Sequence, residues 1–414
     1  MILPCLLSLQ RLSLANVAAC FGADTQRLLL AISVLSVLVA RSALANTDDL
    51  PFELNATYTA DYWANVSGGL QRDSAYLDNL DVTIGIDAEA LWGLNGVEIF
   101  FYGLYNNGTP FSETIVGDAQ IVSNIETGVQ ALRLYEAWAN VEIGRRSELL
   151  FGLYDLNSEF DALESSALFL HSAHGIGTDI AQAGLNGPSI FPITGLSLRL
   201  ATQWNKRWTT RLAILDGVPG DPEDPADTTI RLSEEEGALL IGEIDYTREQ
   251  SRLLLGAWGY TASFSTDPLD VSDSTERSYG NSGAYVRGET ILREANPTIA
   301  AFARYGQAFG DFNVFSQFIS AGMTWRGLDS RPDDEFGVAF AWAEASDDVR
   351  DLAESSGRAL DGREIAIELT YRFPVSEWLS LQPNVQYVIN PGLDPALDDA
   401  LAFGVRFELQ MPNL

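Results

Sequence analysis

The last part of the chain alternates between apolar and polar residues in three successive segments. From Glu364 to Phe373 the odd positions are apolar or aromatic, and most even positions are polar. The same alternation runs through 379–390 and 401–409. Because successive side chains of a β-strand point to opposite faces, these segments are predicted to be two-faced strands of about ten residues. A tilted strand of that length is able to cross a bilayer.

The two-faced pattern recurs along most of the chain. It is cleanest in 52–66, and the segment 80–90 follows it with the same period. Less regular strands are predicted near 97–105, 129–143, 148–155, 195–204, 208–215, 238–247, 252–262, 283–292, 298–306, 314–325 and 336–344. With the three closing segments this makes about sixteen strands, whereas an ordinary sheet has about five or six.

The connections between these strands alternate in length. Long polar connections occupy 106–128, 156–194, 216–237, 263–282 and 345–362, and most of the others have about three to five residues. The segments 307–312 and 327–335 break this alternation. Short connections that alternate with long ones are typical of a transmembrane barrel, in which the long loops lie at one rim. We therefore predict an all-β fold, a transmembrane antiparallel β-barrel of about 16 strands with short periplasmic turns and long extracellular loops. A soluble periplasmic β-sandwich that binds glycans is the alternative, since it also alternates.

The N-terminus has the features of an export signal. The apolar run 28–40 follows Arg27 and precedes the small-residue pattern Ser42–Ala45. Such a run is too short for a membrane-spanning helix, so 1–45 is predicted to be a removed signal peptide and 46–414 a single outer-membrane β-barrel domain. A lipoprotein signal ending at Cys20 is the alternative. Either way Cys5, which lies upstream, is removed, and cleavage after Ala45 also removes Cys20.

The acidic composition narrows the choice of partners. The formal net charge is −32, which disfavours nucleic acid as a partner. Divalent cations bound at acidic loops are one interpretation of this charge, and a solvated acidic surface is the other.

A closed sheet of sixteen strands leaves an aqueous channel. One face of each strand is therefore expected to line the channel, and the other face is expected to lie on the outside of the barrel. The polar face of the closing strands is predicted to line water, and it carries Glu364, Glu368, Arg372, Gln382, Gln386 and Arg406. The apolar face is predicted to lie outside, and it carries Ile365, Leu369, Val385, Tyr387, Phe403 and Val405.

No catalytic arrangement of residues is apparent. The only histidines, His171 and His174, lie three residues apart in the longest connection without identifiable further ligands. The nucleophile motif Gly-x-Ser-x-Gly and a glycine-rich phosphate loop are absent from the sequence. We therefore expect neither an enzyme nor a cofactor or metal site.

Several ordered motifs resemble those of the carbohydrate-selective outer-membrane porins. In the C-terminal third they are FARYG (302–306), SAGMTWRGL (320–328), DDEFGVAFAWAEAS (333–346), EIAIELTYRF (364–373) and LQPNVQYVINPG (381–392). Upstream they are YTADYWANVSGGL (58–70), GDAQIVSNIE (117–126), RLYEAWANV (133–141) and LLFGLYDLNSEF (149–160). The resemblance implies a sixteen-stranded barrel through which sugars diffuse across the outer membrane of a Gram-negative cell.

A sugar channel needs aromatic surface for the ring and polar groups for the hydroxyls. The connections 106–128 and 156–194 are expected to fold into the lumen and narrow it. The residues predicted to line the channel or contact sugar, most by inward parity and Arg133 and Glu136 by motif position, are Asp61, Trp63, Asp81, Glu89, Arg133, Glu136, Glu368 and Arg372. A general or cation-preferring diffusion porin is the alternative function. The sequence leaves monomer and homotrimer equally open.

Overall fold

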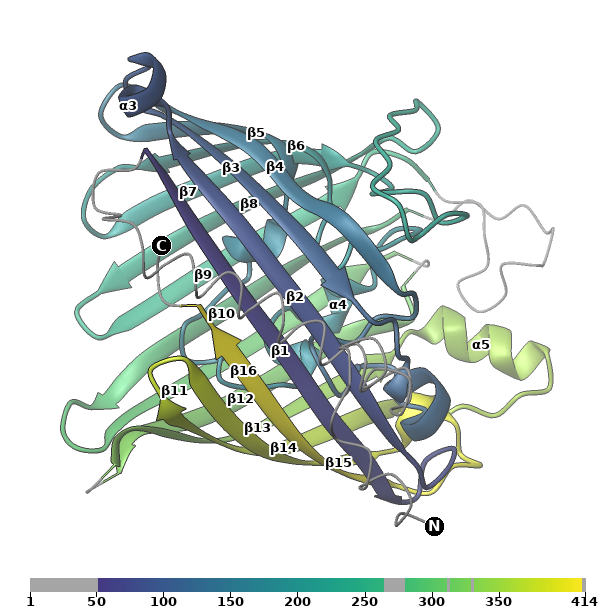
Figure 1. Cartoon of the computed structure of the whole chain (residues 1–414). Coiled ribbons are helices and arrows are strands. Elements are labelled where there is room, and N and C mark those ends of the chain that lie inside the picture. Colours follow the sequence, from purple (N-terminus) through teal and green to yellow (C-terminus); the bar gives the residue numbers. More distant parts are fainter. Residues whose placement is uncertain (1–50, 264–279, 311–312, 329–330, 412–414) are drawn as a thin grey trace, which may run out of the picture. The chain divides into compact units, whose positions relative to one another are not determined.

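The computed structural model describes residues 51–263, 280–310, 313–328 and 331–411. The predicted signal peptide and both cysteines lie outside the described residues. Sixteen antiparallel strands form a closed barrel in which each strand pairs with its neighbours in chain order and β1 pairs with β16 (Figure 1). The predicted fold class and the number of strands are therefore confirmed.

The strands are as follows: β1 Phe52–Ser67, β2 Ser74–Asp87, β3 Val97–Asn106, β4 Ala131–Ile143, β5 Ser147–Tyr154, β6 Gly195–Gln203, β7 Trp208–Asp216, β8 Ala238–Arg248, β9 Ser251–Tyr260, β10 Ser282–Arg293, β11 Thr298–Phe309, β12 Phe315–Leu328, β13 Arg331–Ala345, β14 Arg363–Ser376, β15 Leu379–Ile389 and β16 Ala400–Gln410. The described α-helices are α3 Ala88–Trp92, α4 Thr178–Ala181 and α5 Asp347–Ser355.

The apolar face of the strands lies outside the barrel. Leu369 is 44% exposed and Phe403 is 45% exposed, whereas Glu368, one residue from Leu369, has no exposed surface. The register aligns Glu368 with Gln386, so the polar residues of adjacent strands share the inner face. A soluble sandwich has the opposite arrangement, with its apolar face covered. This inversion rules out the soluble sandwich considered above.

Among the described residues, no helix combines the length and the apolar character that a membrane-spanning helix needs.

The strand bounds keep one of the two predicted exceptions to the alternation of connections and remove the other. The connection between β11 and β12 is short, as predicted. The long connection predicted at 327–335 is wrong, because β12 extends to Leu328 and β13 already begins at Arg331. The acidic run Asp333–Glu335 suggested a loop, but Glu335 lies on the inner face, where it pairs in register with Arg326. Long connections therefore gather at one rim of the barrel, together with α5 (Figure 1).

The predicted strand 80–90 is shorter than expected. It ends at Asp87, whose carboxylate accepts hydrogen bonds from the amides of Glu89 and Ala90 and so caps α3. Gly93 ends this helix in the left-handed conformation, with a φ of 69°. The prediction that Glu89 lines the channel is therefore wrong, because Glu89 is an exposed residue of α3 in the turn between β2 and β3.

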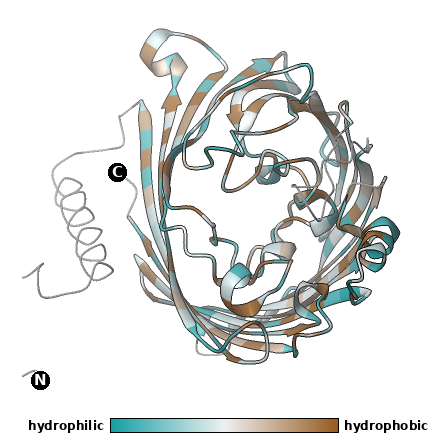
Figure 2. Cartoon of the chain, turned by 90° about the vertical axis from the view of Figure 1, so that its right-hand side faces the viewer, coloured by the Kyte–Doolittle hydropathy of each residue, from teal (hydrophilic) through white to brown (hydrophobic). Residues whose placement is uncertain are grey.

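Two long connections enter the barrel and pack against its inner wall (Figure 2). The connection 155–194 contributes Leu156, Phe160 and Ile180 to an apolar cluster with inward residues of β5 and of β7–β11. The connection 107–130 contributes Phe111 and Val122 to a second cluster. These clusters lie inside the barrel, so part of the lumen is occupied by protein.

Close packing of β16 against β1 allows a prediction about Gly404. A Cβ atom at this position would lie 2.6 Å from the ring of Trp63, which is fully buried and has no room to move. We expect Gly404→Ala to lower the free energy of unfolding by about 1–3 kcal/mol, the usual cost of overpacking. Urea titration of the folded barrel in detergent measures this. Gly85→Ala is the matched control on the inner wall, because its Cβ meets no atom within 4 Å. Equal stability of both variants would contradict the expectation.

Candidate functional site

The connection 155–194 is held on one side of the barrel by two arginines. Arg304 of β11 donates from Nε to Asp161 at 2.8 Å and from Nη1 to Asp179 at 2.6 Å. Arg287 of β10 pairs with Asp161 at 3.2 Å and donates to the carbonyl oxygen of His174 at 2.6 Å. All of these charged side chains are buried. A buried charge needs a partner, so the arginines fix this connection to the wall.

Glu368 and its neighbours hold the same connection on another part of the wall. The carboxylate of Glu368 accepts hydrogen bonds from the amides of Leu170 at 2.7 Å and His171 at 3.1 Å. Gln382 of β15 donates to the carbonyl oxygen of Leu168 at 2.6 Å. The connection therefore spans from β10 and β11 to β14 and β15, and it crosses the lumen.

The two histidines of this connection are neutral packing residues. Both are fully enclosed, and burial lowers the pKa of His171 to about 3 and lowers that of His174. Among the described residues, no group of three or more histidine, cysteine, aspartate or glutamate side chains is placed to hold a metal ion.

The connection 107–130 is attached near the junction of the first and last strands. Asp61 of β1 forms two hydrogen bonds with Arg406 of β16, at 2.7 and 2.8 Å. The hydroxyl of Ser123 donates to the same Asp61 at 2.7 Å, and the ring of Phe111 stacks on Trp63 at 6.1 Å. This connection therefore covers the inner face of β1 and β16.

One part of the inner wall that the connections leave partly exposed lies on β2, β3 and β4. Tyr102 of β3 donates its hydroxyl to Asp81 of β2 at 2.6 Å. Phe100 of β3 stacks on Trp138 of β4, with ring centroids 4.9 Å apart and planes 24° from parallel. These four side chains are partly exposed and point into the lumen. They place aromatic surface beside a carboxylate, and we call them the aromatic wall.

A β-bulge at Tyr135 explains how two residues of different parity face the lumen. Tyr102 pairs with Glu136 and the next residue of β3 pairs with Leu134, so Tyr135 is the extra residue. Arg133 on one side of the bulge and Glu136 on the other side are consequently both inward. Simple alternation does not predict this arrangement.

Glu136 and Arg133 are both engaged by connections. Glu136 accepts hydrogen bonds from the amide of Asp155 at 2.9 Å and the indole of Trp138 at 3.3 Å. Arg133 donates from Nε to the carbonyl oxygen of Pro225 at 3.1 Å and so holds the connection between β7 and β8. Glu136 is therefore part of the border of the aromatic wall, whereas Arg133 supports a loop.

A charged group borders the same space on β6 and β7. Arg199 of β6 donates to Glu159 at 2.7 Å, and Glu159 belongs to the connection 155–194. Arg211 of β7 lies 3.3 Å from Glu243 of β8. The lumen beside the aromatic wall is thus lined by paired charges of both signs.

The structure separates the predicted site residues into different roles. Asp61, Trp63 and Glu368 have no exposed surface, and all three contact connections that fold into the barrel. Arg372 lies on the inner face of β14 and pairs with Glu408 at 3.1 Å, far from full burial. Two of the predicted residues are neighbours of Tyr102 of the aromatic wall. Tyr102 donates a hydrogen bond to Asp81, and it is the register partner of Glu136.

Sequence reasoning missed the aromatic members of this wall. Phe100, Tyr102 and Trp138 lie on inward positions, but the residues predicted to line the channel do not include them. The usable signal was the alternation of Glu98, Phe100 and Tyr102 on one face, because a charged residue marks the side that faces water. The anchoring arginines carried a similar signal, a charge in the middle of an otherwise apolar strand.

Comparison with known proteins gives consistent matches. The sequence profile of the OprB family of carbohydrate-selective porins matches residues 71–411. Porin B of Pseudomonas aeruginosa is 22% identical over 395 residues, which cover 86% of this chain and 87% of that protein. The high-pH structure of OprB from Pseudomonas putida aligns with a TM-score of 0.76 and 19% identity, over 90% of this chain and 96% of that chain. The low-pH structure aligns with a TM-score of 0.55 and 15% identity, over 90% and 95% of the two chains.

Proposed function

Because this chain belongs to the OprB family of carbohydrate-selective porins, we propose that sugars cross its barrel along the aromatic wall of β2, β3 and β4. The protein is a channel of the outer membrane for carbohydrates and is not an enzyme. The stacked pair of Phe100 and Trp138 beside Asp81 is the observation that carries the proposed path.

The chemistry of this wall suits a sugar. A pyranose ring has apolar C–H faces and a rim of hydroxyl groups. The rings of Phe100 and Trp138 offer apolar surface, while Asp81 and Glu136 accept hydrogen bonds from hydroxyls. The carboxylates already have protein partners, so contacts with sugar replace some of the water around them and remain weak. Weak contacts are what a conducting channel requires.

Trp138→Ala is expected to weaken block of the ion current by glucose or maltose about tenfold. Loss of an aromatic contact of about 1–1.5 kcal/mol corresponds to that factor. Current noise in planar bilayers, recorded at increasing sugar concentration, measures it. Trp208→Ala is the matched control, because Trp208 is exposed on the outward face of β7.

Unchanged sugar block in Trp138→Ala, or equal weakening in the Trp208→Ala control, would refute the aromatic wall as the path. Complete absence of sugar block in the unmodified protein would remove sugar contact in the lumen altogether.

A general or cation-preferring diffusion porin is the second candidate. The net charge of −32 and the exposed inward carboxylates Glu98 and Glu148 favour it. The reversal potential in a salt gradient separates the two candidates, since strong cation preference without sugar block supports the second. Bound divalent cations, contact of the outer apolar face with lipid, and assembly as a monomer or homotrimer stay predictions.

A further inference from the structure

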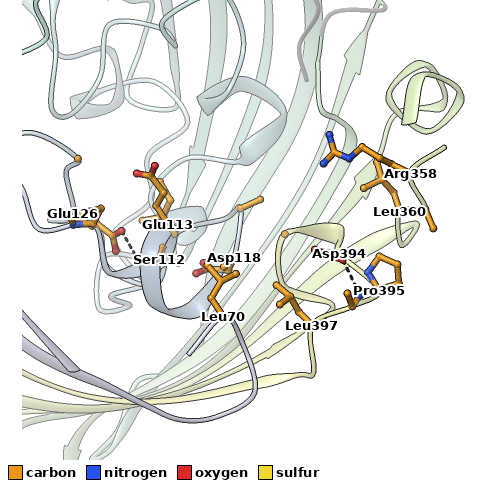
Figure 3. A pocket seen from close by; sticks show the side chains of 18 of the residues that line it. Leu70, Ser112, Glu113, Asp118, Glu126, Arg358, Leu360, Asp394, Pro395 and Leu397 are labelled. Carbon is orange, nitrogen blue, oxygen red and sulfur yellow. Dashed lines mark hydrogen bonds between the residues drawn. The ribbon is translucent and has the colours of Figure 1, made fainter. Parts of the chain in front are cut away.

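A cavity of about 740 Å³ lies among the long connections, apart from the aromatic wall (Figure 3). Four connections contribute to it: those between β1 and β2, between β3 and β4, between β13 and β14, and between β15 and β16. Its volume is within the range of about 300–1,000 Å³ that is usual for small-molecule sites. The lining includes Leu70, Asp118, Glu126, Arg358, Asp394 and Leu397.

Asp118 is the unusual member of this lining. It is 7% exposed, and neither carboxylate oxygen accepts a hydrogen bond of normal geometry from the described residues, although Ser112 and the amide of Ile121 lie nearby. Glu126 resembles it in part. One of its oxygens accepts a bond from the amide of Ser112 at 2.7 Å, and the other has no partner among the described residues. Buried acceptors without donors are uncommon and call for an explanation.

Burial makes these carboxylates costly when they are charged. It raises the pKa of Asp118 to about 6, and burial together with the charge of Asp118 raises the pKa of Glu126 to about 8. A raised pKa means that the folded chain disfavours the charged form, so ionised Asp118 costs folding free energy above about pH 6. Asp118 therefore does not stabilise the fold at neutral pH.

The cavity is preformed. Glu364 of β14 accepts hydrogen bonds from the amides of Ala119 at 2.9 Å, Gln120 at 3.0 Å and Gly392 at 2.6 Å. One carboxylate thus fixes two of the four connections that line the cavity. A fixed cavity with unpartnered acceptors is ready to bind donors.

The lining selects the chemistry of the ligand. Leu70 and Leu397 provide apolar surface, while Asp118 requires hydrogen-bond donors and the free oxygen of Glu126 can accept or, when protonated, donate a hydrogen bond. Sugar hydroxyls are donors with adjacent C–H surface, and this combination matches the lining. A metal ion fits less well, because the described residues contain no group of three ligating side chains. Asp394 adds a further carboxylate to the lining, whereas Arg358 is its one cationic side chain. The lining is therefore negatively charged and repels an acidic sugar.

We infer that this cavity is an outer carbohydrate site, which binds neutral or ammonium-bearing sugars and rejects acidic ones before they reach the aromatic wall. The inference deepens the proposed function and rests on it. Its location on the rim of long connections allows it to bind sugar independently of Trp138.

The test uses the full-length protein in detergent micelles and saturation-transfer NMR with glucose, glucosamine and glucuronate as probes. Trp138→Ala is the background, so that binding at the aromatic wall is reduced. In this background glucose and glucosamine are expected to bind, and glucuronate is not. Adding Asp118→Ala is expected to weaken glucose binding about tenfold, which corresponds to loss of a hydrogen bond to a charged group. Asp224→Ala, an exposed aspartate of the connection between β7 and β8, is the matched control.

A cavity-filling variant and a stability measurement show whether weaker binding comes from the cavity itself. Ala396→Trp, which fills the cavity without altering a carboxylate, is expected to abolish the same binding. Asp118→Ala is also expected to leave stability at pH 8 unchanged or higher, so weaker binding cannot be attributed to unfolding.

Unchanged glucose affinity in Asp118→Ala overturns the inference. Binding of Ca²⁺ that depends on Asp118, without binding of sugar, also overturns it and assigns a cation site. If Trp138→Ala alone leaves current block unchanged while Asp118→Ala still weakens binding, the path along the aromatic wall fails and the outer site stands.

Discussion

Arg304→Ala is expected to widen the channel and to lower the free energy of unfolding by about 3–5 kcal/mol. The guanidinium of Arg304 is fully buried and pairs with both Asp161 and Asp179, and it lies 5.2 Å from the centre of the Tyr285 ring. Removing it leaves two carboxylates buried without their main partner. The connection 155–194 then loses its attachment to β11, while Arg287 still holds it to β10, and its β11 side is expected to move toward solvent.

Single-channel conductance and urea titration measure the two effects together. Conductance is expected to rise, because the connection occupies less of the lumen, and sugar block is expected to fall. Arg326→Ala is the matched control on the next strand, since Arg326 is 64% exposed in its side chain and its pair with Glu335 contributes little. If conductance in Arg304→Ala equals that of the control, the remaining attachments through Arg287 and Glu368 hold the connection and the expectation fails.

Asp61→Ala is expected to weaken the junction that closes the barrel. Asp61 and Arg406 join the first strand to the last, and Asp61 also receives the hydroxyl of Ser123 from the connection 107–130. The variant leaves Arg406 buried without its carboxylate, at a cost of about 3–5 kcal/mol. Folding yield into liposomes and urea titration measure this loss.

A double-mutant cycle identifies the cause. Asp61→Ala combined with Arg406→Ala removes both charges, so the double variant is expected to be more stable than the sum of the single changes predicts. Arg372→Ala is the control, because its pair with Glu408 on the same wall is partly exposed and contributes at most about 1 kcal/mol. Strict additivity of Asp61→Ala and Arg406→Ala would show that the pair does not hold the junction.

The strands were predictable because one physical rule governs every residue in them. Period-two alternation assigned Ile365, Leu369 and Phe403 to the outside and Glu364 and Gln386 to the inside, and the structure confirms both faces. Errors arose where local chemistry interrupts the period. Asp87 begins a capped helix, which removed Glu89 from the wall, and the acidic run before Phe336 concealed the start of β13.

The site was less predictable, because inward parity does not distinguish a residue that faces water from one that faces a loop. Trp63 and Asp81 both lie on inward positions of adjacent strands. Trp63 is covered by Phe111, whereas Asp81 remains partly exposed beside Tyr102. The difference depends on where the connection 107–130 packs, and alternation along the strand contains no information about it.

The sequence by itself determined the closed sheet, its two faces and the rim that carries the long connections, because each depends on neighbours one or two residues apart or on lengths along the chain. The tertiary structure alone decided which inward residues hold connections and which face the lumen. Arg304 and Asp161 are separated by 143 positions, and Asp61 and Arg406 by 345. Such pairs form only when the barrel closes and its connections fold inward, so their charges become anchors through burial that no local pattern specifies.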